Sequence, residues 1–304
     1  MMTVLRTTSL PLTKPSQENG TKNDKADFER DHVTIAIAGV TLIICLLGLV
    51  GNGIVLSFLG FRIKRTVFTI YVLNLAASDF GFLLCLAVSR TVHVTPLFHL
   101  KDLTKSLDLL LVFTYSTSLY LLTAISAERC VSVLFPIWHR CHRPKHLSAI
   151  ICALLWALSG LLTGVSSIVC FLFSNYCLKM VIRLTGTNFL IFTPITVLSS
   201  LILIIKVPRR SQGSQPGKLY IVILLNVLFF LLLVVPFSIV TFFHNYVHYE
   251  HFITSSLLLA SLNSSINPVI YFFVGSYRNQ QFKGSVKKAL QNVFEGEMDT
   301  RGKD

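Results

Sequence analysis

Seven apolar runs dominate this chain of 304 residues. They cover residues 33–59, 67–88, 107–134, 147–173, 181–205, 219–243 and 252–274. A helix needs about 20 apolar residues to cross the hydrocarbon core of a bilayer, and each run is long enough for that. The gaps between the runs are short, so no soluble domain is inserted. The sequence therefore predicts an all-α membrane protein, built as a bundle of seven transmembrane helices.

The composition agrees with a chain that lies mostly in lipid. Hydrophobic residues make up 53% of it and charged residues 13%, whereas a soluble domain usually carries about 25% charged residues. The formal net charge is +13, but the bases lie in short gaps between apolar runs and not on one soluble face. Nucleic acid is therefore excluded as a partner. The seven Cys include no C-x-x-C pair, so a structural metal site is unsupported.

The bases also predict how the chain is oriented, because short loops rich in Lys and Arg stay in the cytoplasm. The gaps after the first, third and fifth runs, and the segment after the seventh, hold most of them. We therefore expect residues 1–32 to be an extracellular tail, 33–274 the membrane domain and 275–304 a cytoplasmic segment. The sequon at Asn19 falls on the extracellular side, where Asn19 can carry a glycan.

The segment after the seventh run has the pattern of a short amphipathic helix. Phe282, Val286, Leu290 and Val293 recur with helical spacing, and Lys residues lie between them. Such a helix is expected to lie on the inner surface of the membrane, in contact with lipid. An ordinary solvated helix is the alternative.

An acid and a base stand together at the end of the third run. Glu128 and Arg129 close an unbroken apolar stretch, and further basic residues follow as far as Arg143. Ionisable residues are costly near a bilayer, so a charged pair at the mouth of a helix is a functional candidate. The alternative is a pair that merely extends its charges into the interface.

Five polar residues are expected at one depth inside the membrane. Counted from the cytoplasmic ends of their runs, Asn52, Asp79, Ser118, Asn263 and Asn267 lie roughly 12–18 Å deep. A carboxylate at that depth must be paired, hydrated or protonated, and the surrounding hydroxyl and amide oxygens suit a small hard cation such as sodium. The alternative is a structural hydrogen-bond network with no ion. We expect no other cofactor.

With these residues placed, the chain resembles a rhodopsin-like G-protein-coupled receptor over essentially its whole length. The matching positions are Gly51-Asn52, Leu75 to Asp79, Glu128-Arg129-Cys130, Trp156 and Asn267-Pro268-Val269-Ile270-Tyr271. Three stretches are similar to the Mas and Mas-related receptors in particular: Ala124 to Cys130, Pro136 to Pro144 and Asn263 to Gly275.

The resemblance implies a plasma-membrane receptor and not an enzyme. An extracellular peptide or small-molecule ligand would favour outward movement of the helix at 219–243, after which Arg129 would receive a heterotrimeric G protein of the Gq or Gi type. The resemblance assigns roles in activation to six residues: Glu128, Arg129, Pro236, Asn267, Pro268 and Tyr271. It also implies that Asp79, Ser118, Asn263 and Asn267 hold an allosteric sodium ion.

The chain departs from the general pattern around the sixth run. Val234 stands two residues before Pro236, where most rhodopsin-like receptors place a Trp. Residues 216–218 are Pro-Gly-Lys and provide no acid to restrain Arg129. The restraint is therefore expected to come from the neighbouring Glu128.

The resemblance also implies a disulfide at the extracellular side. The third run has no Cys at its outer end, and Mas-related receptors instead pair a Cys at the end of the fourth helix with one at the start of the fifth. Cys170 and Cys177 fit that pattern. Two free thiols are the alternative, because a loop this short can force poor disulfide geometry.

The ligand is expected to be anionic. Mas-related receptors for cationic ligands use two acids, and the matching positions here are Ser166 and Val181. The outer ends of the helices instead offer Arg90, Lys179 and Arg183, with Asp108 as the nearest acid, and Arg can bind a carboxylate or phosphate through two hydrogen bonds. The alternative is that these bases extend toward lipid headgroups.

A secondary transporter or channel with an intramembrane cation site at Asp79 is the main competing function. Against it, the chain shows one acid in mid-membrane and no internal repeat, and seven helices do not divide into equal halves. An intramembrane hydrolase is weaker still, because it would need a His near a Ser within the bundle.

Overall fold

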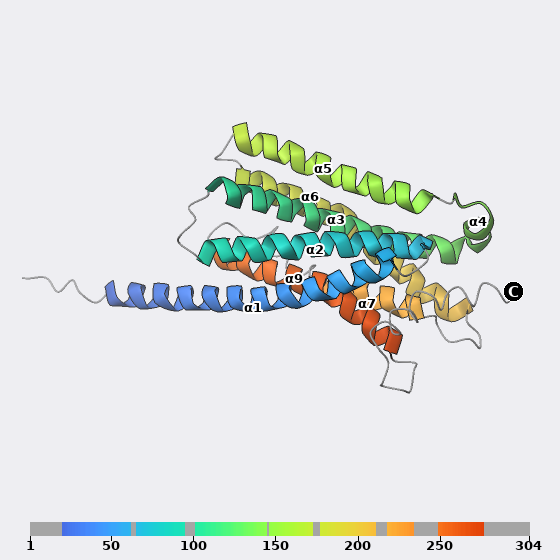
Figure 1. Ribbon diagram of the computed structural model, residues 1–304, viewed down its shortest axis with the longest axis horizontal. Coiled ribbons are helices and arrows are strands. Elements are labelled where there is room, and N and C mark those ends of the chain that lie inside the picture. The colour runs from blue at the N-terminus through green and yellow to red at the C-terminus, as the bar shows by residue number, and fades with distance from the viewer. Residues whose placement is uncertain are drawn as a thin grey trace, which may run out of the picture.

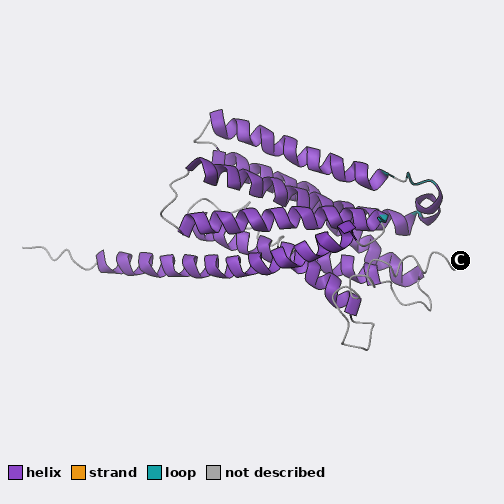
Figure 2. Cartoon of the chain, in the orientation of Figure 1, coloured by secondary structure: helices purple, strands orange, loops and turns teal. Residues whose placement is uncertain are grey.

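The computed structural model describes residues 20–61, 65–94, 101–144, 146–172, 177–210, 218–233 and 249–276. In this part of the chain nearly every residue is helical and none lies in a strand (Figure 2). The helices are α1 (Gly20–Phe61), α2 (Val67–Val94), α3 (Lys101–Leu134), α4 (Pro136–Cys141), α5 (Leu147–Leu172), α6 (Cys177–Arg210), α7 (Lys218–Leu233) and α9 (Tyr249–Ser276). The predicted all-α class is confirmed.

Seven long helices correspond to the seven apolar runs, and they lie side by side in one bundle (Figure 1). Six of them, within the described residues, are long and apolar enough to cross a membrane. The helix of the sixth run, α7, is described for 16 residues, and the rest of that run, with Val234 and Pro236, lies outside the described residues. The short α4 lies at one end of the bundle, in the connection between α3 and α5, and we call this the α4 end (Figure 1).

The first helix begins earlier than the apolar pattern indicated. We expected an extracellular tail up to residue 32, but α1 already begins at Gly20 and projects beyond its neighbours at the end opposite α4 (Figure 1). Residues 20–32 contain Lys, Ala, Glu and Arg and no Pro, so they favour a helix without being apolar. Asn19 and the predicted amphipathic helix after residue 276 lie outside the described residues.

The interior of the bundle is formed mainly by α2 and α3. Helix α2 packs between α1 and α3, α3 also packs against α5 and α6, and α9 lies along α1. Large side chains such as Tyr71, Tyr120 and Tyr271 are almost fully buried there. Many apolar side chains on α1, α5 and α6 point outward instead, as expected of helices whose solvent is lipid.

Glycines allow α1 to approach α9 closely. A Cβ at Gly51 would lie 3.1 Å from Cβ of Pro268, and one at Gly48 would overlap Oγ of Ser265. Small residues permit this kind of contact between membrane helices. The amide of Asn52 strengthens the contact by donating to the carbonyl of Ser264 over 3.1 Å. On its other side α9 meets α2, where the amide of Asn267 donates to Asp79.

Polar contacts also attach α5 to the interior helices. The indole nitrogen of Trp156 donates to Oδ1 of Asn74 on α2 over 3.1 Å. The hydroxyl of Ser159 donates to the carbonyl of Phe113 on α3 over 2.8 Å. These contacts fix α5 against the two helices that carry the candidate functional residues.

Candidate functional site

The buried carboxylate of Asp79 joins three helices. Oδ1 accepts a 2.7 Å hydrogen bond from the hydroxyl of Ser118 on α3, and Oδ2 accepts one of the same length from the amide of Asn267 on α9. The hydroxyl of Ser264 also lies beside it. The side chain of Asp79 is 0% exposed, so these contacts replace the water that a carboxylate would otherwise require.

Of the residues predicted to share this depth, Ser118 and Asn267 bond to Asp79, whereas Asn52 donates to the carbonyls of Gly48 and Ser264. Asn52, Ser118 and Asn267 are buried with Asp79. Asn263 is also buried, but within the described residues it makes no hydrogen bond to Asp79, and Ser264 lies there instead. Counting depth could not distinguish neighbours on α9, because one residue turns a side chain by about 100° around the helix.

The donor set around Asp79 fits a sodium ion. A carboxylate, the hydroxyls of Ser118 and Ser264 and the amide oxygen of Asn267 are hard oxygen ligands of the kind that small cations without d electrons prefer. The same groups also satisfy one another through hydrogen bonds. Both an ion site and a structural network are therefore compatible with this geometry.

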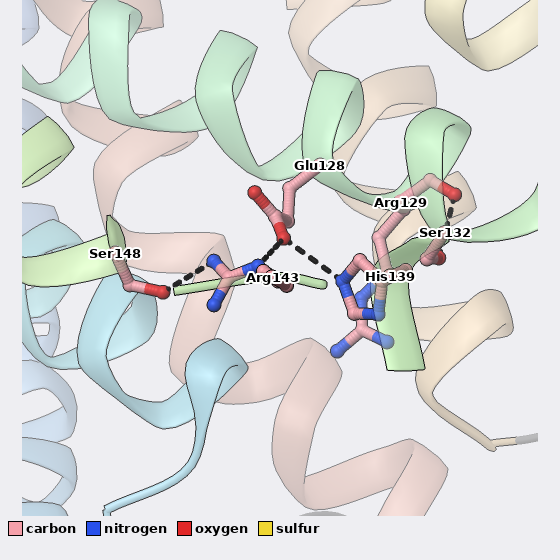
Figure 3. Close-up of polar contacts among 6 residues, drawn as sticks. All are labelled: Glu128, Arg129, Ser132, His139, Arg143 and Ser148. Atoms are coloured by element: carbon pink, nitrogen blue, oxygen red, sulfur yellow. Dashed lines mark hydrogen bonds and ion pairs between the residues drawn. The ribbon is translucent and has the colours of Figure 1, made fainter. Parts of the chain in front are cut away.

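A second polar cluster lies at the α4 end (Figure 3). Glu128 on α3 accepts a 2.7 Å hydrogen bond from Nε of Arg143 and a 3.0 Å contact from Nε2 of His139, both at Oε1. Because a carboxylate only accepts, the contact with His139 is a hydrogen bond in the tautomer that has its proton on Nε2. Arg143 also donates to the hydroxyl of Ser148 at the start of α5 over 2.7 Å. The segment between α3 and α5 is thereby attached to both helices.

Burial strengthens the contact between Glu128 and Arg143. Their side chains are 14% and 4% exposed. Charge-assisted hydrogen bonds shielded from water in this way are stronger than ion pairs on an open surface.

The partners of Glu128 differ from the expectation that it would restrain Arg129. The guanidinium carbon of Arg129 instead lies 4.6 Å from the ring centroid of Phe68, a buried residue near the start of α2. A small pocket opens beside this pair, lined among others by Thr66, Phe68, Glu128 and Arg129. Glu128 and Arg129 are neighbours in sequence, but their side chains serve different contacts.

Helix α4 forms where the sequence offers a helix start. Pro136 occupies its first position, where the missing N–H costs nothing, and Phe135 precedes it. Phe135, Ile137 and Trp138 are exposed, while His139 turns back toward Glu128. Sequence reasoning assigned no role to Phe68, His139, Arg143 or Ser148. The basic residues that follow Arg129 in the sequence indicated a charged cluster here, but they did not show which base would bind Glu128.

The residues expected to rearrange on activation lie along α9. Pro268 stands inside the helix, between Asn267, which contacts Asp79, and the buried Tyr271. The close contact with Gly51 accommodates the ring of Pro268. Pro236 lies outside the described residues.

The end opposite α4 carries the predicted ligand residues. Arg90 on α2 and Asp108 on α3 are within electrostatic reach of each other, and Nε of Arg90 is buried and makes no hydrogen bond within the described residues. Lys179 and Arg183 lie on α6, but their side chains are outside the described ones. Cys170, at the end of α5, is disulfide-bonded, while five other cysteines are free.

Comparison with known proteins extends these observations. The profile of the family described as 7 transmembrane receptor (rhodopsin family) matches residues 51–271. The chain is 39% identical to the Proto-oncogene Mas of Mus musculus over 295 residues, which cover 92% of this chain and 90% of that protein.

Two Mas-related receptors are equally similar. The chain is 41% identical to Mas-related G-protein coupled receptor member X1 of Homo sapiens, with 86% of this chain and 84% of that protein covered. It is 41% identical to member H of Mus musculus, with 97% and 94% covered. These similarities extend over both polar clusters and both ends of the bundle.

Proposed function

The chain belongs to the rhodopsin family of seven-transmembrane receptors, as a G-protein-coupled receptor of the Mas-related group, and from this premise we propose how it recognises its ligand and its G protein. It is a multi-pass protein of the plasma membrane and not an enzyme. Its relatives are receptors, so the transporter or channel hypothesis is set aside.

The α4 end faces the cytoplasm in our proposal, and the N-terminus is extracellular. The bases support this orientation, because Arg65 and Arg143 lie at the α4 end, in loops where Lys and Arg are concentrated. A glycan at Asn19 and an amphipathic helix after residue 276 fit the same orientation.

Coupling occurs through Arg129 at the cytoplasmic mouth. The observations that support this most directly are that Glu128 binds Arg143 and His139, and that the guanidinium of Arg129 lies over Phe68 beside a small pocket. Outward movement of the helix that contains α7 and Pro236 opens a cleft for the C-terminal helix of a Gq or Gi α subunit. Asn267, Pro268 and Tyr271 transmit the change along α9.

A sodium ion stabilises the inactive packing. Asp79, Ser118, Ser264 and Asn267 supply its oxygen ligands, and Asn263 is a further candidate from the same turn of α9. The ion connects α2, α3 and α9. A ligand that favours another packing must therefore overcome the free energy of sodium binding.

The extracellular ligand is a peptide or small molecule with an anionic group. Arg183 holds this group, with Arg90 and Lys179 in support. The buried Nε of Arg90 supports the proposal, because a guanidinium nitrogen without an acceptor is available to a carboxylate. Asp108 positions Arg90 from α3. A disulfide between Cys170 and Cys177 fixes the adjacent loop.

A second-messenger panel tests the function. Cells that express the receptor are challenged with peptides and small carboxylates, while calcium reports Gq coupling and inhibition of cAMP reports Gi coupling. We expect a saturable response to an anionic compound in one of the two assays. Responses confined to polycationic peptides would contradict the ligand class, and responses only through a stimulatory G protein would contradict the coupling class.

A further inference from the structure

The position of Arg129 raises the question of what holds it before the G protein binds. Residues 216–218 supply no acid from the sixth helix, and Glu128 is engaged by Arg143 and His139. The guanidinium lies over the face of Phe68 instead, with 4.6 Å between Cζ and the ring centroid. This distance is well within the roughly 6 Å over which a cation is attracted to the negative face of an aromatic ring.

The surroundings of the ring favour this contact. Phe68 is 4% exposed and belongs to the same buried cluster as Phe58 and Tyr71, so the ring has few other orientations available. Arg129 is only half-buried, and the pocket beside it opens between α2 and α3. A buried ring therefore meets a guanidinium that borders a pocket.

We propose that Phe68 holds Arg129 against α2 in the inactive receptor, as a cation–π restraint in place of the acid that the sixth helix lacks. The inference rests on the proposed coupling role of Arg129. To reach a G protein in the cleft beside α7, the guanidinium has to leave the ring of Phe68. Phe68 is thus a positioning residue, which sets the fraction of receptors whose Arg129 is available without a ligand.

Fluorinated phenylalanines provide the sharpest test. Mono-, di- and trifluorophenylalanine at position 68 withdraw electron density from the ring face while almost preserving its shape. The same series at Phe58, which lies in the same cluster, is the matched control for packing. The readout is ligand-independent nucleotide exchange on purified Gq and Gi heterotrimers with the receptor in nanodiscs. Phe68→Leu is the end point without a ring, and Arg129→Ala gives the baseline.

We expect exchange to increase with each fluorine at position 68 and to reach about two- to fivefold over the parent in Phe68→Leu, the range of a partly exposed cation–π contact. The Phe58 series should stay flat. Equal exchange across the Phe68 series, or parallel increases in both series, would overturn the restraint, because packing alone does not respond to the charge on a ring face.

A second measurement examines the contact without relying on coupling. In receptor labelled at arginine, the δ-methylene protons of Arg129 should show an upfield ring-current shift that disappears in Phe68→Leu. An unchanged shift would overturn the contact itself. If the shift is present but neither the parent nor Phe68→Leu exceeds Arg129→Ala with any heterotrimer, the proposed coupling fails and the restraint fails with it. Exchange that depends on Arg129 but not on fluorination removes the restraint alone.

Discussion

At the scale of single residues, two ionisable side chains next to each other in the sequence have separate environments. The carboxylate of Glu128 is nearly enclosed by Arg143 and His139, whereas the guanidinium of Arg129 lies beside an open pocket. Arg143 and His139 thus bind Glu128, whereas Arg129 contacts the ring of Phe68. The two residues therefore differ in what their substitution is expected to do.

Replacing Arg129 with Ala should abolish nucleotide exchange while leaving the receptor at the cell surface. Arg129 makes its described side-chain contact with Phe68 at the edge of the bundle, so its loss costs little packing. Agonist-stimulated exchange is measured at matched surface levels. His142→Gln, an exposed change at the α4 end, serves as control and should couple normally. Normal coupling by Arg129→Ala would remove it from the G-protein interface.

Sodium should stabilise the receptor through Asp79. A ligand that binds only the folded state adds about 1.4 kcal/mol for each tenfold rise in concentration above its Kd. Thermal unfolding in sodium chloride is compared with unfolding in choline chloride. We expect the sodium effect in the parent and not in Asp79→Asn.

Serine variants separate the ion from a general effect of the network. Ser118→Ala removes a group that contacts Asp79 and should reduce the sodium response. Ser261→Ala removes a buried hydroxyl that bonds the carbonyl of Leu258, and should leave the response intact. If all variants respond like the parent, the residues around Asp79 form a structural network and bind no sodium.

The sequence predicted only some of the contacts between side chains. The grouping of Asp79, Ser118 and Asn267 followed from their depth alone, because a helix advances a fixed distance per residue. The partner of Glu128 did not, because Arg143 lies 15 residues away beyond a short helix whose path no periodicity specifies. The contact of Arg129 with Phe68 likewise depends on how α2 and α3 pack.

At the scale of elements, α4 depends on the polar cluster beneath it. Six residues are too few for a helix that is stable by itself, so its position rests on His139 and on Arg143 just beyond its end. Arg143→Gln should therefore loosen residues 136–144. We expect about tenfold faster amide hydrogen exchange there, which is roughly 1.4 kcal/mol of local stability and within the range for one charged hydrogen bond.

The matched control for Arg143→Gln is Cys141→Ser. Cys141 is an exposed free thiol on the same helix, and its change should leave exchange unaltered. Glu128→Gln combined with Arg143→Gln should be no worse than Arg143→Gln alone, because the pair is already broken. Additive losses would show that the two residues act independently.

The contact between α1 and α9 depends on the absence of side chains. Gly48→Ala places a Cβ against Ser265, so one of the two helices must shift, at a cost of about 1–3 kcal/mol. Gly39→Ala on the same helix meets nothing within 4 Å and should be neutral or slightly stabilising, since Ala favours helix over Gly. Thermal unfolding of the two variants measures the difference in their stability. A Gly48→Ala protein as stable as Gly39→Ala would show that the contact adapts without cost.

Elements were the most predictable part of the fold. Apolar runs located all seven long helices, because length and hydropathy are direct requirements of the bilayer. They missed the helical residues 20–32 of α1 and the whole of α4, which contribute too little apolar length to be recognised.

At the scale of the whole molecule, the residues proposed to bind the ligand and those proposed to bind the G protein belong to opposite ends of the bundle. Helices α2, α3 and α9 connect them, and the cluster around Asp79 joins the three helices near the middle. A ligand at one end can therefore change the other only by shifting how these helices pack. This makes the charge of the ligand testable through its effect on signalling.

Arg183→Gln should reduce the potency of an anionic agonist by about tenfold to a hundredfold, the value of one charge-assisted contact. The amide of the same agonist should be weak on the parent and no weaker on the variant. Dose–response curves for acid and amide on both proteins form a complete cycle. Equal potency in all four combinations would exclude Arg183 from the ligand site, and the same cycle with Arg90→Gln examines the supporting base.

Helix α1 begins well before the apolar run that crosses the membrane. Residues 20–32 form a continuous helix with the membrane-spanning part of α1, and at 1.5 Å per residue they rise about 20 Å. In the proposed orientation these residues stand on the extracellular surface, and Asn19 directly precedes them in the sequence. A glycan on Asn19 would then be separated from the apolar part of α1 by this length of helix, which would leave small ligands a free approach to the bundle.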